Sequence, residues 1–206
     1  MKLLASKSTA VKVLASVVLV GTAASVAGLG TFGAFTSTTT ASHDVSTGKL
    51  VLSTTAGAQD FGLPVTNMVP GDTIQRSVTL TRSTDTEAFG SVKLTSSADV
   101  SNLLTTDTTN GLQLKVEECS VAWVKAANTN DLTCAGQVDT LVTPRAVLAG
   151  TGADLAHATT SLNGTAKAAN LKVTLTLPAD AGNSFQGLTN TIKFTFDATQ
   201  RAAKAL

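Results

Sequence analysis

One alternating stretch, LKVTLTL, runs through residues 171–177 and decides the fold class. Its apolar residues occupy every second position, so an extended chain places them on one face and the polar residues on the other. The same pattern recurs, with Arg76 as one interruption, in residues 74–81, 112–117 and 192–197. Each stretch therefore predicts a strand with one buried and one exposed face.

Weaker alternation marks further candidate strands at residues 49–53, 92–95, 121–125 and 138–142. Turn-forming residues separate the candidates: Pro70-Gly71-Asp72, Asn110-Gly111, Asn163-Gly164 and residues 180–183. We expect Gly71 to adopt the positive φ of a tight turn. Many short strands with such punctuation predict an all-β fold, an antiparallel β-sandwich or jelly roll, in preference to a parallel α/β fold.

Helical content is expected to be minor. The Ala-rich residues 144–158 favour one or two short helical turns, with Pro144 suited to a first turn, although Gly150 and Gly152 divide the stretch. A further helical turn is expected at residues 101–105.

The composition argues against nucleic-acid binding. The 206 residues carry 15 Lys plus Arg against 14 Asp plus Glu, and only 4% are aromatic. A net charge of +1 provides no basic field for phosphates, and few rings are present on which bases could stack. With 43% hydrophobic residues the chain can still bury a core, so intrinsic disorder is also disfavoured.

The N-terminal region has the pattern of a secretory signal peptide followed by one β domain. Three lysines precede an apolar run at residues 13–20: Lys2, Lys7 and Lys12. A membrane anchor is the alternative, but the run is shorter than a spanning helix requires and is diluted by small and polar residues. We expect a signal peptide at residues 1–33, an N-terminal segment at 34–45, the β domain at 46–200 and a short tail at 201–206. The product is expected to be secreted, in the extracellular matrix or at the cell surface.

Two cleavage positions fit the preference for small residues at −3 and −1. Cleavage after Gly33 uses Thr31 and Gly33, and cleavage after Ala27 uses Ser25 and Ala27. The residue rules alone do not choose between them.

Cys119 and Cys134 are the two cysteines of the chain. In an exported protein this pair predicts one disulfide that closes a short loop. A metal or redox site is the alternative, but the sequence has no C-x-x-C or H-E-x-x-H motif, and its two histidines, His43 and His157, are far apart. We expect Trp123 to pack over the disulfide, and we expect neither a metal nor a cofactor.

Short motifs near both ends of the exported part resemble one known family. They are GTFGAFT at residues 30–36, STGKLVL at 46–52, MVPGD at 68–72, GNSFQG at 182–187 and FTFDATQ at 194–200. This ordered set resembles the TasA and camelysin (CalY) family of secreted bacterial proteins. The resemblance implies a jelly-roll domain, export through a SipW-type signal peptidase with processing near Gly33 or Ala34, and a role as a subunit of extracellular biofilm-matrix fibres.

The resemblance also implies a mode of assembly. In TasA-like fibres the N-terminal segment of one subunit completes a sheet of the next, so the main partner would be a second copy in a head-to-tail homopolymer. An anchoring or accessory matrix protein would be a minor partner, and the membrane would not be one after cleavage. This mode requires a sheet edge that the subunit leaves unpaired; a solvated tail is the alternative for the donor segment. The segment lacks Pro, Gly and charge and comprises Ala34, Phe35, Thr36, Ser37, Thr38, Thr39, Thr40, Ala41 and Ser42.

Two other functions compete with a fibre subunit. The runner-up is a monomeric cell-surface binding or adhesin module of the same fold. The third is a metalloendopeptidase, as camelysin is described. A zinc peptidase needs about three protein ligands and a carboxylate base, whereas this chain has two histidines, and its three glutamates lie at no useful helical spacing from them. We therefore do not expect an enzyme.

Overall fold

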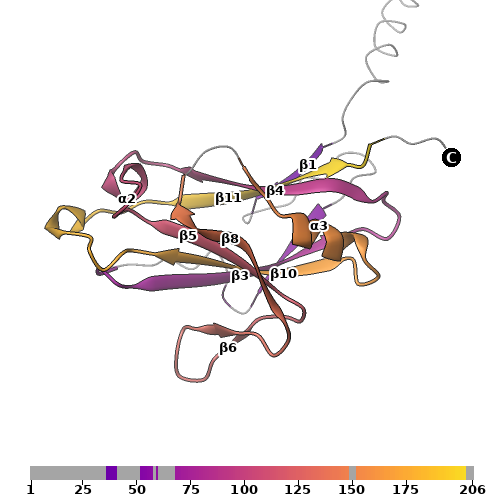
Figure 1. Ribbon diagram of the computed structural model, residues 1–206, viewed down its shortest axis with the longest axis horizontal. Coiled ribbons are helices and arrows are strands. Elements are labelled where there is room, and N and C mark those ends of the chain that lie inside the picture. Colours follow the sequence, from indigo (N-terminus) through magenta and orange to yellow (C-terminus); the bar gives the residue numbers. More distant parts are fainter. Residues whose placement is uncertain (1–35, 41–51, 58, 60–67, 149–151, 203–206) are drawn as a thin grey trace, which may run out of the picture. The chain divides into compact units, whose positions relative to one another are not determined.

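The computed structural model describes residues 36–40, 52–57, 59, 68–148 and 152–202, which form an antiparallel β-sandwich (Figure 1). One sheet has the order β1-β11-β4-β9, with β1 at Thr36–Thr40, β4 at Phe89–Ala98, β9 at Ala153–Asp154 and β11 at Ile192–Gln200. The other has the order β2-β3-β10-β5-β8, with β2 at Leu52–Ala56, β3 at Thr73–Arg82, β5 at Gln113–Cys119, β8 at Val138–Ala146 and β10 at Ala168–Thr176. The predicted all-β sandwich is confirmed.

The alternating stretch at residues 171–177 lies mainly in β10, the central strand of the five-stranded sheet. β10 pairs with β3 along one side and with β5 along the other. Its residues alternate between buried and half-buried, and Leu171 and Val173 are fully buried. They share one core with Leu94 of β4 and Phe196 of β11 from the opposite sheet. Burial of alternate apolar side chains from both sheets therefore holds the two layers together.

Helices occupy a minor part of the described chain. Helix α2 (Leu103–Thr106) confirms the predicted turn at residues 101–105, and the side chain of Asn102 caps it by accepting from the Leu104 N–H. A 3-10 turn, η1 (Asn183–Phe185), follows β10. None of the described helices has the length and hydropathy needed to cross a membrane.

The predicted helix near residue 144 was placed too early in the chain. Pro144 lies inside the edge strand β8, and helix α3 spans Ala156–Asn163. The register of β8 with β5 skips Pro144 and is irregular on both sides of Val116. An edge strand with such an irregularity tolerates a residue without an N–H group, so local propensity was overridden by sheet pairing.

A tight turn leads into β3. Gly71 has φ +96°, as predicted, and the Asp72 N–H closes its turn by donating to the Val69 carbonyl at 3.0 Å.

A small hairpin, β6 (Val124–Lys125) and β7 (Leu132–Thr133), follows the end of β5. The predicted strand at residues 121–125 is therefore only two residues long.

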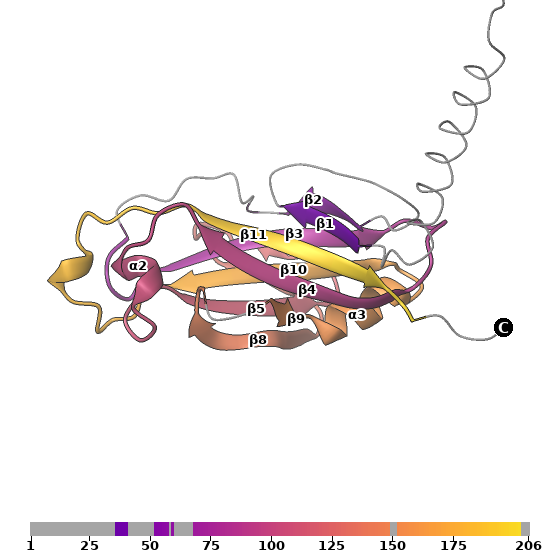
Figure 2. The same ribbon diagram turned by 90° about the horizontal axis from the view of Figure 1, so that it is seen from above.

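The outer edge of β11 is occupied by the chain's own β1. The two strands pair antiparallel from Thr36 opposite Thr199 to Thr40 opposite Thr195. Figure 2 shows β1 beside β11 and close to β2. Within the single chain the outer edge of β11 is therefore paired by residues 36–40, and β1 itself becomes the margin of this sheet.

Truncation of a central core residue tests this fold. We expect Leu171→Ala to lower the free energy of unfolding by about 2–5 kcal/mol, because it removes a fully buried side chain and leaves a cavity. Leu103→Ala is the matched control, since Leu103 is 40% exposed in α2, and its cost should stay below about 1 kcal/mol. Urea unfolding of both variants measures this; equal losses would contradict the assigned core.

Candidate functional site

The candidate assembly site is the terminal edge, which we define as β1 together with β11. β11 is fixed in the sandwich because Phe194, Phe196 and Ala198 are buried in the core and because its other side pairs with β4. β1 is a five-residue strand that forms one margin of this sheet. Its pairing with β11 uses backbone groups, which an identical strand from another molecule could supply equally well.

The opposite margins of the two sheets are less suited to strand addition. β9 is two residues long. β8 is longer but contains Pro144, and its pairing with β5 is interrupted by register shifts. Short strands, prolines and bulges are the features by which natural sheets block edge-to-edge pairing. Among the described strands, these features distinguish the β8–β9 side from the terminal edge.

The structure describes part of the predicted assembly segment. Residues 36–40 form β1, which pairs with β11 of the same chain. The other members of the segment, Ala34, Phe35, Ala41 and Ser42, lie outside the described residues, as do the predicted cleavage positions, Thr31, Gly33 and Ala34.

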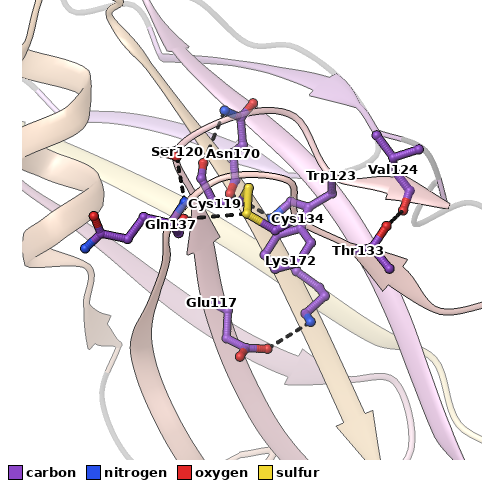
Figure 3. Close-up of a disulfide and its surroundings, with 10 residues drawn as sticks. All are labelled: Glu117, Cys119, Ser120, Trp123, Val124, Thr133, Cys134, Gln137, Asn170 and Lys172. Carbon is purple, nitrogen blue, oxygen red and sulfur yellow. Dashed lines mark hydrogen bonds and ion pairs between the residues drawn. A yellow bond between two sulfur atoms is a disulfide. The ribbon is translucent and has the colours of Figure 1, made fainter. Parts of the chain in front are cut away.

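The predicted disulfide between Cys119 and Cys134 is confirmed. Their Cα atoms are 5.9 Å apart, and the bridge joins the end of β5 to the residue after β7. Trp123 lies beside the bridge (Figure 3) and forms a small second core with it. Leu132 belongs to the same core. The Trp123 Nε1–H donates to the Asn170 carbonyl of β10 at 2.9 Å. The loop thus folds back over the five-stranded sheet.

A network of ion pairs lies next to Trp123 on the five-stranded sheet. The Lys172 ammonium lies 4.2 Å from the centre of the Trp123 ring and 3.1 Å from a Glu117 carboxylate oxygen (Figure 3). Lys115 pairs with the same carboxylate at 2.6 Å. Burial opposes ionisation of Glu117, but the hydrogen bonds from Lys115 and Lys172 outweigh it and lower the pKa of this carboxyl. The group is a structural network that fastens Trp123 to the sheet.

The hairpin is also tied to β3 and to the chain that follows β2. The Leu132 N–H donates to the Gln75 side-chain oxygen at 2.7 Å. The Gln59 amide donates to the Asn130 carbonyl, and Arg76 donates to the Gln59 side-chain oxygen at 3.2 Å. These contacts give Arg76, which interrupts the alternation of its strand, a structural role. Sequence reasoning missed them, since no local pattern links residues 59, 75 and 130.

The residues considered for a peptidase do not assemble into a metal centre in the described part of the chain. Within residues 36–40, 52–57, 59, 68–148 and 152–202, no group of three or more His, Cys, Asp or Glu side chains is arranged to hold a metal ion. His43 lies outside these residues. His157 is described; its Nδ1 lies 2.9 Å from Glu118 and its Nε2 lies 3.6 Å from Asp139.

A known protein family matches this chain. The family model described as "Camelysin metallo-endopeptidase" matches residues 8–205, which is nearly the whole chain. No curated protein matches the chain.

Removal of the disulfide tests whether the loop needs its covalent bond. We expect the double variant Cys119→Ala/Cys134→Ala to lose about 3 kcal/mol of stability, because the bridge closes a 15-residue separation. Trp123, the single tryptophan, reports on the loop directly. Its fluorescence should shift to longer wavelength if the loop lifts from the sheet.

The control for this experiment is chemical reduction. A reductant should destabilise the natural protein and leave the double variant unchanged. Equal stability of the natural protein and the variant would show that packing of Trp123 alone holds the loop.

Proposed function

The chain belongs to the camelysin metallo-endopeptidase family, and we propose that within this family it is a secreted structural subunit of extracellular fibres, in a biofilm matrix or on the cell surface. Each subunit donates its N-terminal strand to the next. Binding between copies, and not turnover of a substrate, is its function. The observation that carries this proposal is β1, a short strand from the N-terminal side of the chain that occupies a sheet margin.

Strand exchange reconciles this proposal with the closed edge of the single chain. In a monomer, β1 pairs with its own β11. In a fibre, β1 of one copy would make the same register with β11 of another, so the backbone hydrogen bonds lost within a chain are regained between chains. Domain swapping of this kind is a low-cost route to association, and a head-to-tail relation that does not close produces a filament.

Signal-peptide removal would act as the assembly switch. Cleavage near Gly33 or Ala34 would place β1 within a few residues of a new N-terminus, where a strand can leave its edge without threading a loop. Before cleavage, the membrane-held leader would keep β1 from reaching a neighbour. A SipW-type signal peptidase is the expected processing partner, and an accessory matrix protein a further one.

A monomeric cell-surface binding module is the second candidate. The intramolecular pairing of β1 with β11 favours it, because a chain that completes its own sheet needs no neighbour. The two candidates differ in one respect only, which is the molecule that supplies the strand on β11.

The family description makes a metallo-endopeptidase the third candidate. We expect the purified protein not to cleave casein in a chelator-sensitive manner, because catalytic zinc normally requires about three protein ligands and the described residues bring no such group together. The measurement is casein hydrolysis with added Zn²⁺, with and without chelator. Cleavage that chelator stops and His157→Ala abolishes would replace the fibre proposal.

Cross-linking of mixed variants tests strand exchange directly. Thr40 of β1 stands opposite Thr195 of β11. We expect a mixture of Thr40→Cys protein and Thr195→Cys protein to form disulfide-linked heterodimers, because only exchange brings these positions together between chains. Non-reducing electrophoresis of the assembled sample gives the result.

Each single variant, oxidised alone, is the control and should give little covalent dimer. Fibres that form without heterodimer would contradict strand exchange. Absence of fibres, together with an intramolecular bond in the Thr40→Cys/Thr195→Cys chain, would favour the monomeric module. Deletion of residues 34–42 should abolish fibres and leave the circular dichroism of the domain intact.

A further inference from the structure

Two carboxylates face each other across the pair of strands at one side of the five-stranded sheet. Glu118 of β5 is the register partner of Asp139 of β8. Like charges directly opposite one another on antiparallel strands are destabilising. The Glu118 side chain is only 5% exposed, so its charge is costly unless a partner compensates it. This register therefore requires a cation or a bound proton.

His157, the second residue of α3, supplies that partner. Its Nδ1 lies 2.9 Å from a Glu118 oxygen and its Nε2 lies 3.6 Å from an Asp139 oxygen. A neutral imidazole has one N–H donor and one acceptor, so it cannot present a proton toward both carboxylates. The imidazolium presents an N–H toward Glu118 and places a positive charge near Asp139 as well. The ring is half-exposed, with 52% of its side-chain surface accessible, so protons exchange freely with solvent.

We propose that His157, Glu118 and Asp139 form a proton-dependent clasp that fastens helix α3 to β5 and to the edge strand β8. The clasp is closed when His157 is protonated. Loss of the proton leaves the two carboxylates opposite each other without a cation between them. The release would fall on the side of the sandwich away from the terminal edge, where β8 forms the margin of its sheet.

The clasp affects packing because of what α3 covers. Ala158 and Leu162 of α3 are fully buried in the main core, and α3 contacts β3, β4, β8 and β10. The start of α3 has no side-chain cap, and a cation in a first helical turn is opposed by the helix dipole. The two carboxylates therefore offset an otherwise unfavourable position for the imidazolium.

The strands around α3 carry several other charged groups. Arg82 of β3 donates to the Leu162 carbonyl near the far end of α3 at 2.9 Å. Arg76 donates to Gln59, and Lys115 and Lys172 pair with Glu117. Lys93 of β4 stands opposite Asp154 in register, and the buried Nε of Arg145 in β8 has no hydrogen-bond partner in the described structure. The charges acting on His157 are those of Glu118 and Asp139.

The direction of the pH effect follows from the sign of the shift. The hydrogen bond to Glu118 raises the pKa of His157 above its usual value, against an opposing effect of burial. A raised pKa in the folded state means that the contribution to stability is fully present below the unfolded-state value of about 6.5 and is lost as pH rises through the folded-state value. Mildly acidic surroundings close the clasp, and alkaline surroundings open it.

Urea unfolding of the purified chain between pH 5.5 and pH 9 tests the clasp. We expect the midpoint to fall as pH rises, with a slope of at most one proton. In His157→Gln the fall across this window should disappear, and Glu118→Gln should greatly reduce it. His43→Gln is the matched control, because it removes the other histidine of the chain and should leave the fall unchanged.

Two further measurements distinguish a proton switch from a passive contact. In proton NMR titrations the pKa of His157 should lie above 6.5 and should fall in Glu118→Gln. Amide exchange in α3, corrected for intrinsic rates, should be faster at pH 8.5 than at pH 6. A His157 signal with an ordinary pKa, or α3 protection independent of pH, would overturn the proposal even if the His157 variant failed to fold.

Discussion

A strand pairs with the outer edge of β11, and the function proposed for this protein depends on which molecule supplies that strand. The core fixes β11 through buried phenylalanines, so its edge is always presented in the same geometry. β1 covers part of that edge with five residues and is continuous with the N-terminal side of the chain. Because backbone hydrogen bonds do not distinguish one copy from another, the same interaction can close a monomer or extend a fibre.

Other interactions hold together the part of the sandwich away from the edge where we propose strand exchange. The Cys119–Cys134 bridge and Trp123 hold the β6–β7 hairpin on the outer face of the five-stranded sheet. Near the same end of β5, the Ser120 N–H donates to the Gln137 carbonyl at 3.0 Å and joins the start of β8 to the end of β5. The covalent bridge at Cys119 and the proposed clasp at Glu118 thus involve neighbouring residues of β5.

The alternating pattern was sufficient to predict the sandwich, because each strong stretch fell on a strand that buries one face. The cysteine pair and the position of Trp123 were likewise predictable, from export and spacing. Two features were not. Sheet pairing keeps Pro144 in β8, so the helix expected from residue 144 starts later, at Ala156. The meeting of Glu118, Asp139 and His157 depends on strand register. Neither leaves a local pattern in the sequence.

Cryo-electron microscopy of the assembled protein is the most direct test of strand exchange. The map must trace the backbone from β1 through residues 41–51 into β2, which identifies the chain that each β1 belongs to. We expect each β1 to lie antiparallel on β11 of the neighbouring subunit, in the register that pairs Thr36 with Thr199. Filaments in which every β1 lies on its own β11, or a sample that stays monomeric after removal of the signal peptide, would contradict the proposed function.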